Sequence, residues 1–414
     1  MNAHATEHAP AAVGLPPGFE HARHLAWRVA IIGGLVSLLP LVFSTTRFAQ
    51  SYLVAFLFWF GISAASLGAV LLSHLVGGLW GFLIRRPAEA AARNFPLLVL
   101  LFIPIALTLG YLYPWANSDY MEHHHHVQQK AAYLNKTFWL GRMAFYFLLW
   151  SGLTAFLVRL ADAQDRTTDP KPTRTRQFFS GPGLGLFFLT FTFAAMDLGM
   201  SLEPDWYSTI YGVMVLVGSV LATLSFMVIL TSKLADREPL KEVATKTGFH
   251  DLGNMMLGFT MLWAYMSFSQ YLITYSGNLT EEIIWYLHRS VGIWRVIAVC
   301  LIVFHFFVPF FLLLSRDRKR NAQALAKVGL AILVMRFVDL TWLVVPSQAV
   351  TSTVEWIMLL IALPATMAAV GGVWLGSFLG KLEARPLLPS RNDPLLLATL
   401  EHHEHKNKHT GGGH

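Results

Sequence analysis

The chain has 414 residues, of which 55% are apolar and only 13% charged, against roughly 25% charged residues in an ordinary soluble domain. One soluble domain of this size could not bury so much apolar surface, so the composition excludes a soluble enzyme, a disordered chain and a secreted disulfide scaffold. The single cysteine, Cys300, excludes disulfides, cysteine-ligated zinc and iron–sulfur clusters bound by this chain. The net charge of +7 does not indicate nucleic-acid binding, because most of it lies on one side of the predicted membrane.

The sequence contains ten apolar runs, each long enough to form a membrane-spanning helix of about 20 residues. We therefore predict an all-α polytopic membrane protein with ten transmembrane helices. Residues 1–26 form a polar tail, and the first run lacks a small-residue cleavage site, so we expect a retained anchor. The runs are 27–44, 52–75, 95–113, 137–159, 183–202, 207–231, 252–274, 293–314, 328–345 and 354–379.

The basic residues predict the orientation of these helices. With a cytoplasmic N-terminus, most of the 31 Lys and Arg residues lie in the inside segments. The predicted outside loops then hold only Arg47, Lys130, Lys136, Arg289 and Arg295. Both termini are therefore expected in the cytoplasm.

An internal repeat divides the chain. A Tyr and an Arg nine residues apart begin the fourth and the eighth runs, as Tyr133 with Arg142 and Tyr286 with Arg295. An Asp seven residues before a Pro ends the fifth and the ninth runs, as Asp197 with Pro204 and Asp339 with Pro346. We expect two parallel four-helix bundles, 51–204 and 205–346, flanked by single helices in 27–50 and 347–380 and followed by a His-rich cytoplasmic tail, 381–414.

Ionisable residues inside the spans are the candidate functional groups, because a charge in the bilayer is expensive and marks a pathway, a pair or a cavity. Asp197 and Asp339 lie about 10 Å below the outer surface by helical rise. Arg142 and Arg295 begin their spans at similar depth, so a paired Arg and Asp in each bundle is the simplest arrangement. Arg336 is a further fixed charge.

Two interpretations of these carboxylates stay open, a structural pair and a proton carrier. A proton path would have an outer half ending at the two Asp residues, with Glu203 at its edge. A cytoplasmic half would begin near His250 and Asp251, and His305 and Tyr265 could act as relays in the middle. These assignments use positions in the predicted spans alone.

Other histidines do not indicate a cofactor site. A b-type haem needs two histidines on facing helices, and His74 lies near a span end whereas His305 lies deep in its span. The run 123–126 is more typical of a solvated loop than of a metal site, and the tail after Glu401 has the composition of a disordered segment. The sequence contains no dinucleotide fingerprint, phosphate loop or nucleophile motif.

Several long strings of the chain resemble one family of membrane subunits. They are SGPGLGLFFLTFTFAAMDLGMSLEPDWYSTIY (180–211), HDLGNMMLGFTMLWAYMSFSQYLITYSGNLTEEIIWY (250–286), AAYLNKTFWLGR, LLLSRDRKR and VMRFVDLTWLV. The chain resembles, over about residues 25–380, the ActF subunits of bacterial alternative complex III, a quinol:cytochrome c oxidoreductase. These subunits belong to the NrfD, or polysulfide-reductase membrane-subunit, superfamily.

The resemblance implies a multi-pass subunit of the bacterial inner membrane that scaffolds a redox complex and contributes a proton path. Its expected partners are an NrfD-like sister subunit that holds quinol, an iron–sulfur protein, and multihaem and monohaem cytochromes c. Iron–sulfur clusters and haem c are then expected in the partners, and no cofactor in this chain. A quinone in this chain is the open alternative, although Asn135 stands where the second repeat has His288.

Two rival functions remain. A secondary transporter built from parallel repeats should have helices broken near the midplane, whereas most prolines of this chain lie at span ends, with Pro104, Pro309 and Pro364 as exceptions. A purely structural anchor predicts that all intramembrane charges form closed pairs. As a subunit of a redox complex, this chain is not expected to be catalytic alone.

Overall fold

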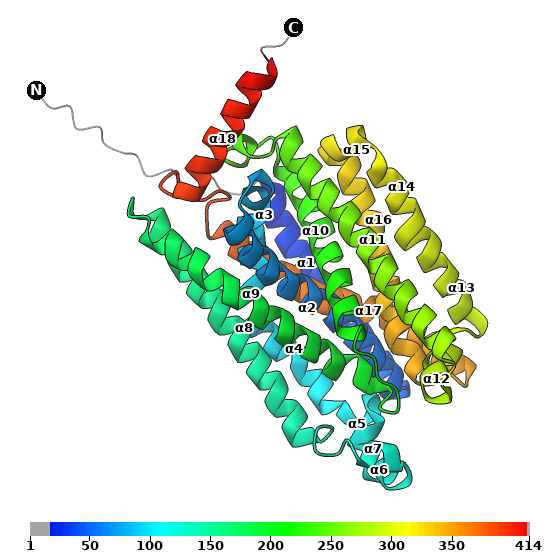
Figure 1. The fold of residues 1–414 in the computed structure, drawn as a ribbon. Helices are drawn as coiled ribbons and strands as arrows, with labels where there is room; N and C mark the ends of the chain where they lie inside the picture. Colours follow the sequence, from blue (N-terminus) through cyan, green and yellow to red (C-terminus); the bar gives the residue numbers. More distant parts are fainter. Residues whose placement is uncertain (1–16, 412–414) are drawn as a thin grey trace, which may run out of the picture.

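The protein is a bundle of long helices that run side by side (Figure 1). The computed structural model describes residues 17–411, and no strand occurs in that range. Eight of its helices are long and apolar enough to cross a membrane, so the protein is a multi-pass helical membrane protein. These helices are α1 (Pro17–Phe43), α2 (Thr45–Val76), α8 (Lys136–Asp165), α9 (Lys171–Leu198), α10 (Tyr211–Leu234), the run Gly292–Leu314, α16 (Ala322–Val344) and α17 (Thr353–Glu383).

Two further predicted spans have a less regular form. The third falls on α4 (Phe95–Leu107), which meets the preceding α3 (Leu79–Ala92) at a bend of 47°, and the two helices make a ninth crossing if they form one span. The sequence predicted a cytoplasmic loop where α3 forms. The seventh is α11 (Lys246–Gly277), a helix of 32 residues that packs on α10 and is not among the eight helices apolar enough to cross a membrane. The count of ten therefore stays a prediction.

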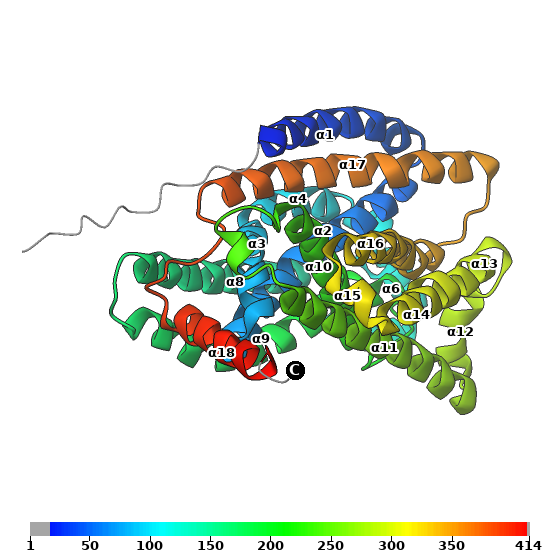
Figure 2. The ribbon, with the colours of Figure 1, turned by 90° about the horizontal axis from the view of Figure 1, so that it is seen from above.

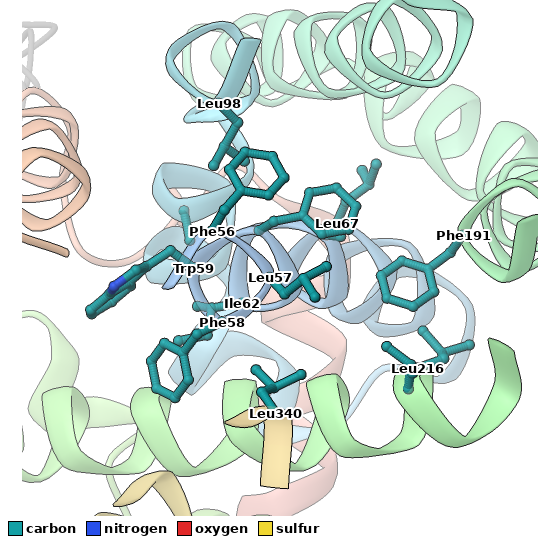
Figure 3. Packing of buried hydrophobic residues seen from close by; sticks show 14 of the residues in the cluster. Phe56, Leu57, Phe58, Trp59, Ile62, Leu67, Leu98, Phe191, Leu216 and Leu340 are labelled. Atoms are coloured by element: carbon teal, nitrogen blue, oxygen red, sulfur yellow. The ribbon is translucent and has the colours of Figure 1, made fainter. Parts of the chain in front are cut away.

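Helix α2 is the centre of the bundle. All of its residues from Arg47 to Gly68 are buried, as expected for a helix that is apolar on every side. Figure 3 shows the packing around Phe56, Phe58 and Trp59, with Leu98 of α4, Phe191 of α9, Leu216 of α10 and Leu340 of α16 on different sides. Helices of both predicted bundles therefore share one core.

Helices α1 and α17 lie side by side along one edge of the molecule (Figure 2). Glycines allow this close approach: a Cβ atom at Gly33 would lie 2.6 Å from the backbone nitrogen of Ala369, and one at Gly372 would lie 2.5 Å from the carbonyl of Ala26. Small residues at helix contacts are typical of membrane bundles. An ion pair between Arg23 and Glu383 joins the start of α1 to the end of α17.

Apart from α1 and α17, the long helices form two groups, and the pattern of helix contacts within one group is similar to that within the other. In the first group α2 packs on α4 and α9, and α8 packs on α9. In the second, α10 packs on α11 and α16, and the span from α13 (Gly292–Cys300) to α14 (Val308–Leu314) packs on α16. The two parallel units, and the superposition of one on the other, stay predictions.

The described chain begins and ends on the same side of the bundle, which we call the α18 end. The opposite side, with α6 (Ser118–His123), α7 (His125–Gln128) and α12 (Thr280–Arg289), is the α12 end. The tail segments differ from expectation in two ways. Helix α1 already begins at Pro17 inside the predicted polar tail, of which residues 1–16 lie outside the described range. The tail after Glu401 is helical, in α18 (Pro394–Gly411).

Contacts of Asp393 explain why the segment that contains α18 is held against the bundle. The Asp393 carboxylate accepts a hydrogen bond from Leu395 N at 3.1 Å and so caps the start of α18. It also makes ion pairs with Arg176, at 3.0 Å, and with Arg85, at 3.5 Å. Both arginines and Asp393 are buried. The segment is therefore attached to the bundle through a buried charge cluster that no local composition rule detects.

Candidate functional site

A buried polar cluster lies between α10, α11 and α16. We call it the central cluster, and it comprises Ser219, Trp263, His305, Arg336 and Asp339. Arg336 donates through Nη1 to Asp339 Oδ2 at 2.5 Å, three residues further along α16. Its Nη2 donates to the Val215 carbonyl at 3.1 Å and reaches Ser219 Oγ at 3.4 Å, both on α10. The pair therefore also joins two helices of the second group.

His305 completes the central cluster from a distorted segment of its span. Residues Leu301–Phe307 form a π-helix between α13 and α14, a distortion that is frequent at functional sites. The ring of His305 is 0% exposed and meets Trp263 edge to face, at 4.3 Å between centroids. Trp263 therefore packs directly on the histidine, and the Arg336–Asp339 pair lies in the same buried region.

The hydrogen-bonding capacity of His305 is unused. Within the described residues neither Nδ1 nor Nε2 has a hydrogen-bond partner. Buried polar atoms are nearly always paired, and an unpaired one costs about 1–3 kcal/mol. Because an imidazole can take up a proton at one nitrogen and release it from the other, this side chain is chemically suited to pass protons.

The carboxylate of the first group has a different environment. Arg142 binds Asp197 with two hydrogen bonds, of 2.9 Å from Nε and 2.7 Å from Nη2, and the Tyr146 hydroxyl adds a third at 3.2 Å. Arg142 also lies over the ring of Tyr133 and donates to its carbonyl. The Asp197 side chain is fully buried. This closed arrangement favours a structural role for Asp197.

The second group does not repeat that pair. Arg295, the counterpart of Arg142 in the sequence repeat, is exposed and donates to the Ser290 carbonyl at 2.8 Å. The cation that pairs with Asp339 is Arg336, which lies on the same helix, α16. The expectation of an interhelical Arg–Asp pair in each bundle is therefore wrong for Arg295 and Asp339, because an arginine at i−3 on the same helix reaches the carboxylate.

Glu203 forms a separate cluster at the α12 end. Its carboxylate makes ion pairs with Arg289 at 2.7 Å and with His288 at 3.0 Å. Arg289 is buried, lies over the ring of Trp285 and donates to the carbonyls of Trp285, Trp342 and Leu343. Burial lowers the pKa of Arg289, and Glu203 opposes this shift.

Three of the proton-path candidates lie away from the central cluster. His250 and Asp251 lie at the start of α11, with 3.9 Å between Nδ1 and Oδ1. Burial and the nearby Lys319 lower the pKa of His250. Tyr265 is 64% exposed, because it stands about 200° around α11 from the inward-facing Trp263. Tyr265 therefore does not line the interior beside His305.

Sequence reasoning missed Trp263 and Arg289 as site residues. Arg289 follows Trp285 by four residues on a short amphipathic helix, which is a detectable spacing for a cation over a ring. Nothing in the sequence distinguishes Trp263 from the other tryptophans. Within residues 17–411, no three His, Cys, Asp or Glu residues are grouped so that they could hold a metal ion.

Comparison with known proteins does not assign this chain to a family. No protein-family model matches it. No curated protein matches it either.

Proposed function

We propose that this chain is a membrane subunit of a quinol:electron-acceptor oxidoreductase of the alternative complex III type. In this role it scaffolds the complex and provides part of a proton path, while electron transfer takes place in its partners. Those partners are an NrfD-like sister subunit, an iron–sulfur protein and multihaem and monohaem cytochromes c. We further propose ten crossings of a bacterial inner membrane with both termini in the cytoplasm.

The observation that carries the proton path is His305 beside the Arg336–Asp339 pair. A histidine with two unused nitrogens and a carboxylate lie in one buried cluster, and Trp263 packs on the histidine ring. A permanent cation cannot relay a proton, so Arg336 serves to hold Asp339 in place. Glu203 at the α12 end and His250 with Asp251 near the α18 end are the proposed outer and inner ends of the path.

The assignment to a redox complex is supported by the sequence strings that resemble the ActF subunits. The isolated chain exposes aromatic and aliphatic surface on α11, α13 and α14, as at Phe268, Val299 and Phe311. Such a surface needs lipid or other subunits around it. Purification in mild detergent tests the assignment: haem c and iron–sulfur subunits should accompany the chain, and a monodisperse lone protein would contradict it.

Proton transfer is tested with the purified complex in vesicles. Asp339→Asn and His305→Gln should each lower the number of protons translocated per quinol oxidised, with the haem content of the complex unchanged. Asp197→Asn is the matched control, because it removes a buried carboxylate of the same depth from a closed pair. It should reduce stability and leave the proton stoichiometry unchanged. Unchanged stoichiometry in both Asp339→Asn and His305→Gln would contradict the proposal.

A secondary transporter is the second candidate, and two observations favour it. The π-helix at Leu301–Phe307 and the 47° bend between α3 and α4 interrupt two spans, as transporters require near a substrate site. Co-purification separates the two candidates. A transporter should remain a stable protein without haem-containing partners, and it should move a solute across vesicles independently of quinol.

A further inference from the structure

A hollow at the α18 end combines an apolar wall with unpaired cations. It lies between the end of α14 and the start of α16 and has a volume of about 380 Å³. Leu312, Val328 and Ala331 provide apolar wall, and Arg318 and Lys327 provide positive charge. No acidic residue lines it. We propose that this hollow binds the phosphate headgroup of an anionic phospholipid, with the acyl chains lying along α14 and α16.

The first argument is the charge of the two cations. Within the described residues, neither the Arg318 nor the Lys327 side chain makes an ion pair or a hydrogen bond. A second hollow provides the contrast: Arg86, Arg93, Lys381 and Arg385 line it. There Glu89 pairs with Arg86 at 3.0 Å and with Arg385 at 2.6 Å. The cations of the second hollow are thus partly neutralised by the protein, whereas those of the first are free to bind an external anion.

The second argument is the position of the hollow on the bundle. Arg318 belongs to the short polar helix α15 (Arg316–Arg320), directly after α14, and Lys327 lies about one turn inside α16. From there the exposed surface toward the centre of the span is apolar, with Leu330 and Val334 on α16 and Phe311 on α14. A charged rim above an apolar track matches an amphiphile with a negative head, and basic pockets between helix ends are typical sites for anionic lipids.

The test uses the full chain with whatever partners remain bound in detergent. After delipidation, native mass spectrometry would follow binding of phosphatidylglycerol and of phosphatidylcholine. We expect phosphatidylglycerol to bind more tightly, and R318Q and K327Q each to weaken it about fivefold. The matched control is K171Q with R174Q, two exposed cations of the same end outside the hollow. This control should leave phosphatidylglycerol binding unchanged.

Two further arms separate a lipid from other anions. Ala331→Phe fills the exposed apolar part of the hollow and leaves both cations, so it should weaken phosphatidylglycerol and not inorganic phosphate. If inorganic phosphate competed equally well and Ala331→Phe had no effect, the site would bind a free anion and the lipid assignment would be wrong. Equal weakening of phosphatidylglycerol binding by the control pair K171Q/R174Q would also overturn the lipid assignment. The same holds if R318Q/K327Q lost a partner subunit while phosphatidylglycerol binding stayed intact. The inference requires only that the chain is embedded in a membrane, so its failure leaves the redox proposal unaffected.

Discussion

The guanidinium of Arg336 lies directly against Gly218, so that a Cβ atom at Gly218 would be 2.2 Å from Nη1 of Arg336. Arg336 cannot move aside freely, because its two terminal nitrogens bind Asp339 and the Val215 carbonyl. Glycine at 218 therefore allows the central cluster to form. Any other amino acid at this position would place its Cβ atom against the guanidinium.

Gly218→Ala is accordingly expected to lower the free energy of unfolding by about 1–3 kcal/mol, the usual cost of an overpacked core. Thermal unfolding in detergent would measure it. Gly258→Ala on α11 is the matched control, since nothing lies within 4 Å of its Cβ position, and it should be neutral or slightly stabilising. Equal effects of the two substitutions would show that the contact with Arg336 is unimportant.

Removing Arg142 should be far more damaging than removing Arg295, although the sequence repeat makes them equivalent. Arg142→Gln leaves the buried Asp197 carboxylate without its cation, which costs about 3–5 kcal/mol. Arg295→Gln removes one exposed hydrogen bond to the Ser290 carbonyl and should cost less than about 1 kcal/mol. Chemical or thermal unfolding of both variants would check this, and a large effect of Arg295→Gln would refute the assigned pairing.

The Asp393 carboxylate should control the attachment of the C-terminal segment. Asp393→Asn removes the anion that faces Arg85 and Arg176, so we expect α18 to detach and the loop before it to become sensitive to protease. Glu401→Gln, at an exposed position on the same helix, should leave the digestion pattern unchanged. Identical patterns for Asp393→Asn and the unsubstituted protein would show that other contacts suffice.

The proposed orientation is tested by labelling single cysteines in a Cys300→Ser background. Ser118 and Gly277 at the α12 end should react with an impermeant reagent from outside the cell. Arg174 and Arg320 at the α18 end should react only after the membrane is opened. Arg174 is preferable to its neighbour Thr173, which is buried. Reversed labelling would place both termini outside.

The positions of most spans could be predicted because a long apolar run is a strong signal that depends on local composition alone. Helix α3 could not, since Arg85, Arg86 and Glu89 read as a polar loop until their buried partners are known. The same limit applies to α18, which depends on Asp393 contacts with residues more than two hundred positions earlier in the chain. Local composition contains no information about such distant partners.

The sequence predicts which residues belong to the candidate site but does not predict which of them are in contact. Buried charges such as Asp339 and Arg336 stand out in an apolar run, and their spacing of three residues was visible. The contact of His305 with Trp263 could not be predicted, because His305 lies in a π-helix that the apolar run does not reveal. Tyr265 points outward because α11 packs with Trp263 facing the interior. The sequence pattern alone does not determine which face of α11 is buried.

The pairing of α1 with α17 has a consequence for biogenesis. Helix α1 is synthesised long before its main partner α17, and Gly33 and Gly372 make that contact too close for a substitute helix. During synthesis α1 must therefore wait in the lipid, or against an insertion chaperone, until more than three hundred residues have followed. A product truncated before α17 would therefore leave α1 without its partner and accessible to membrane quality-control proteases.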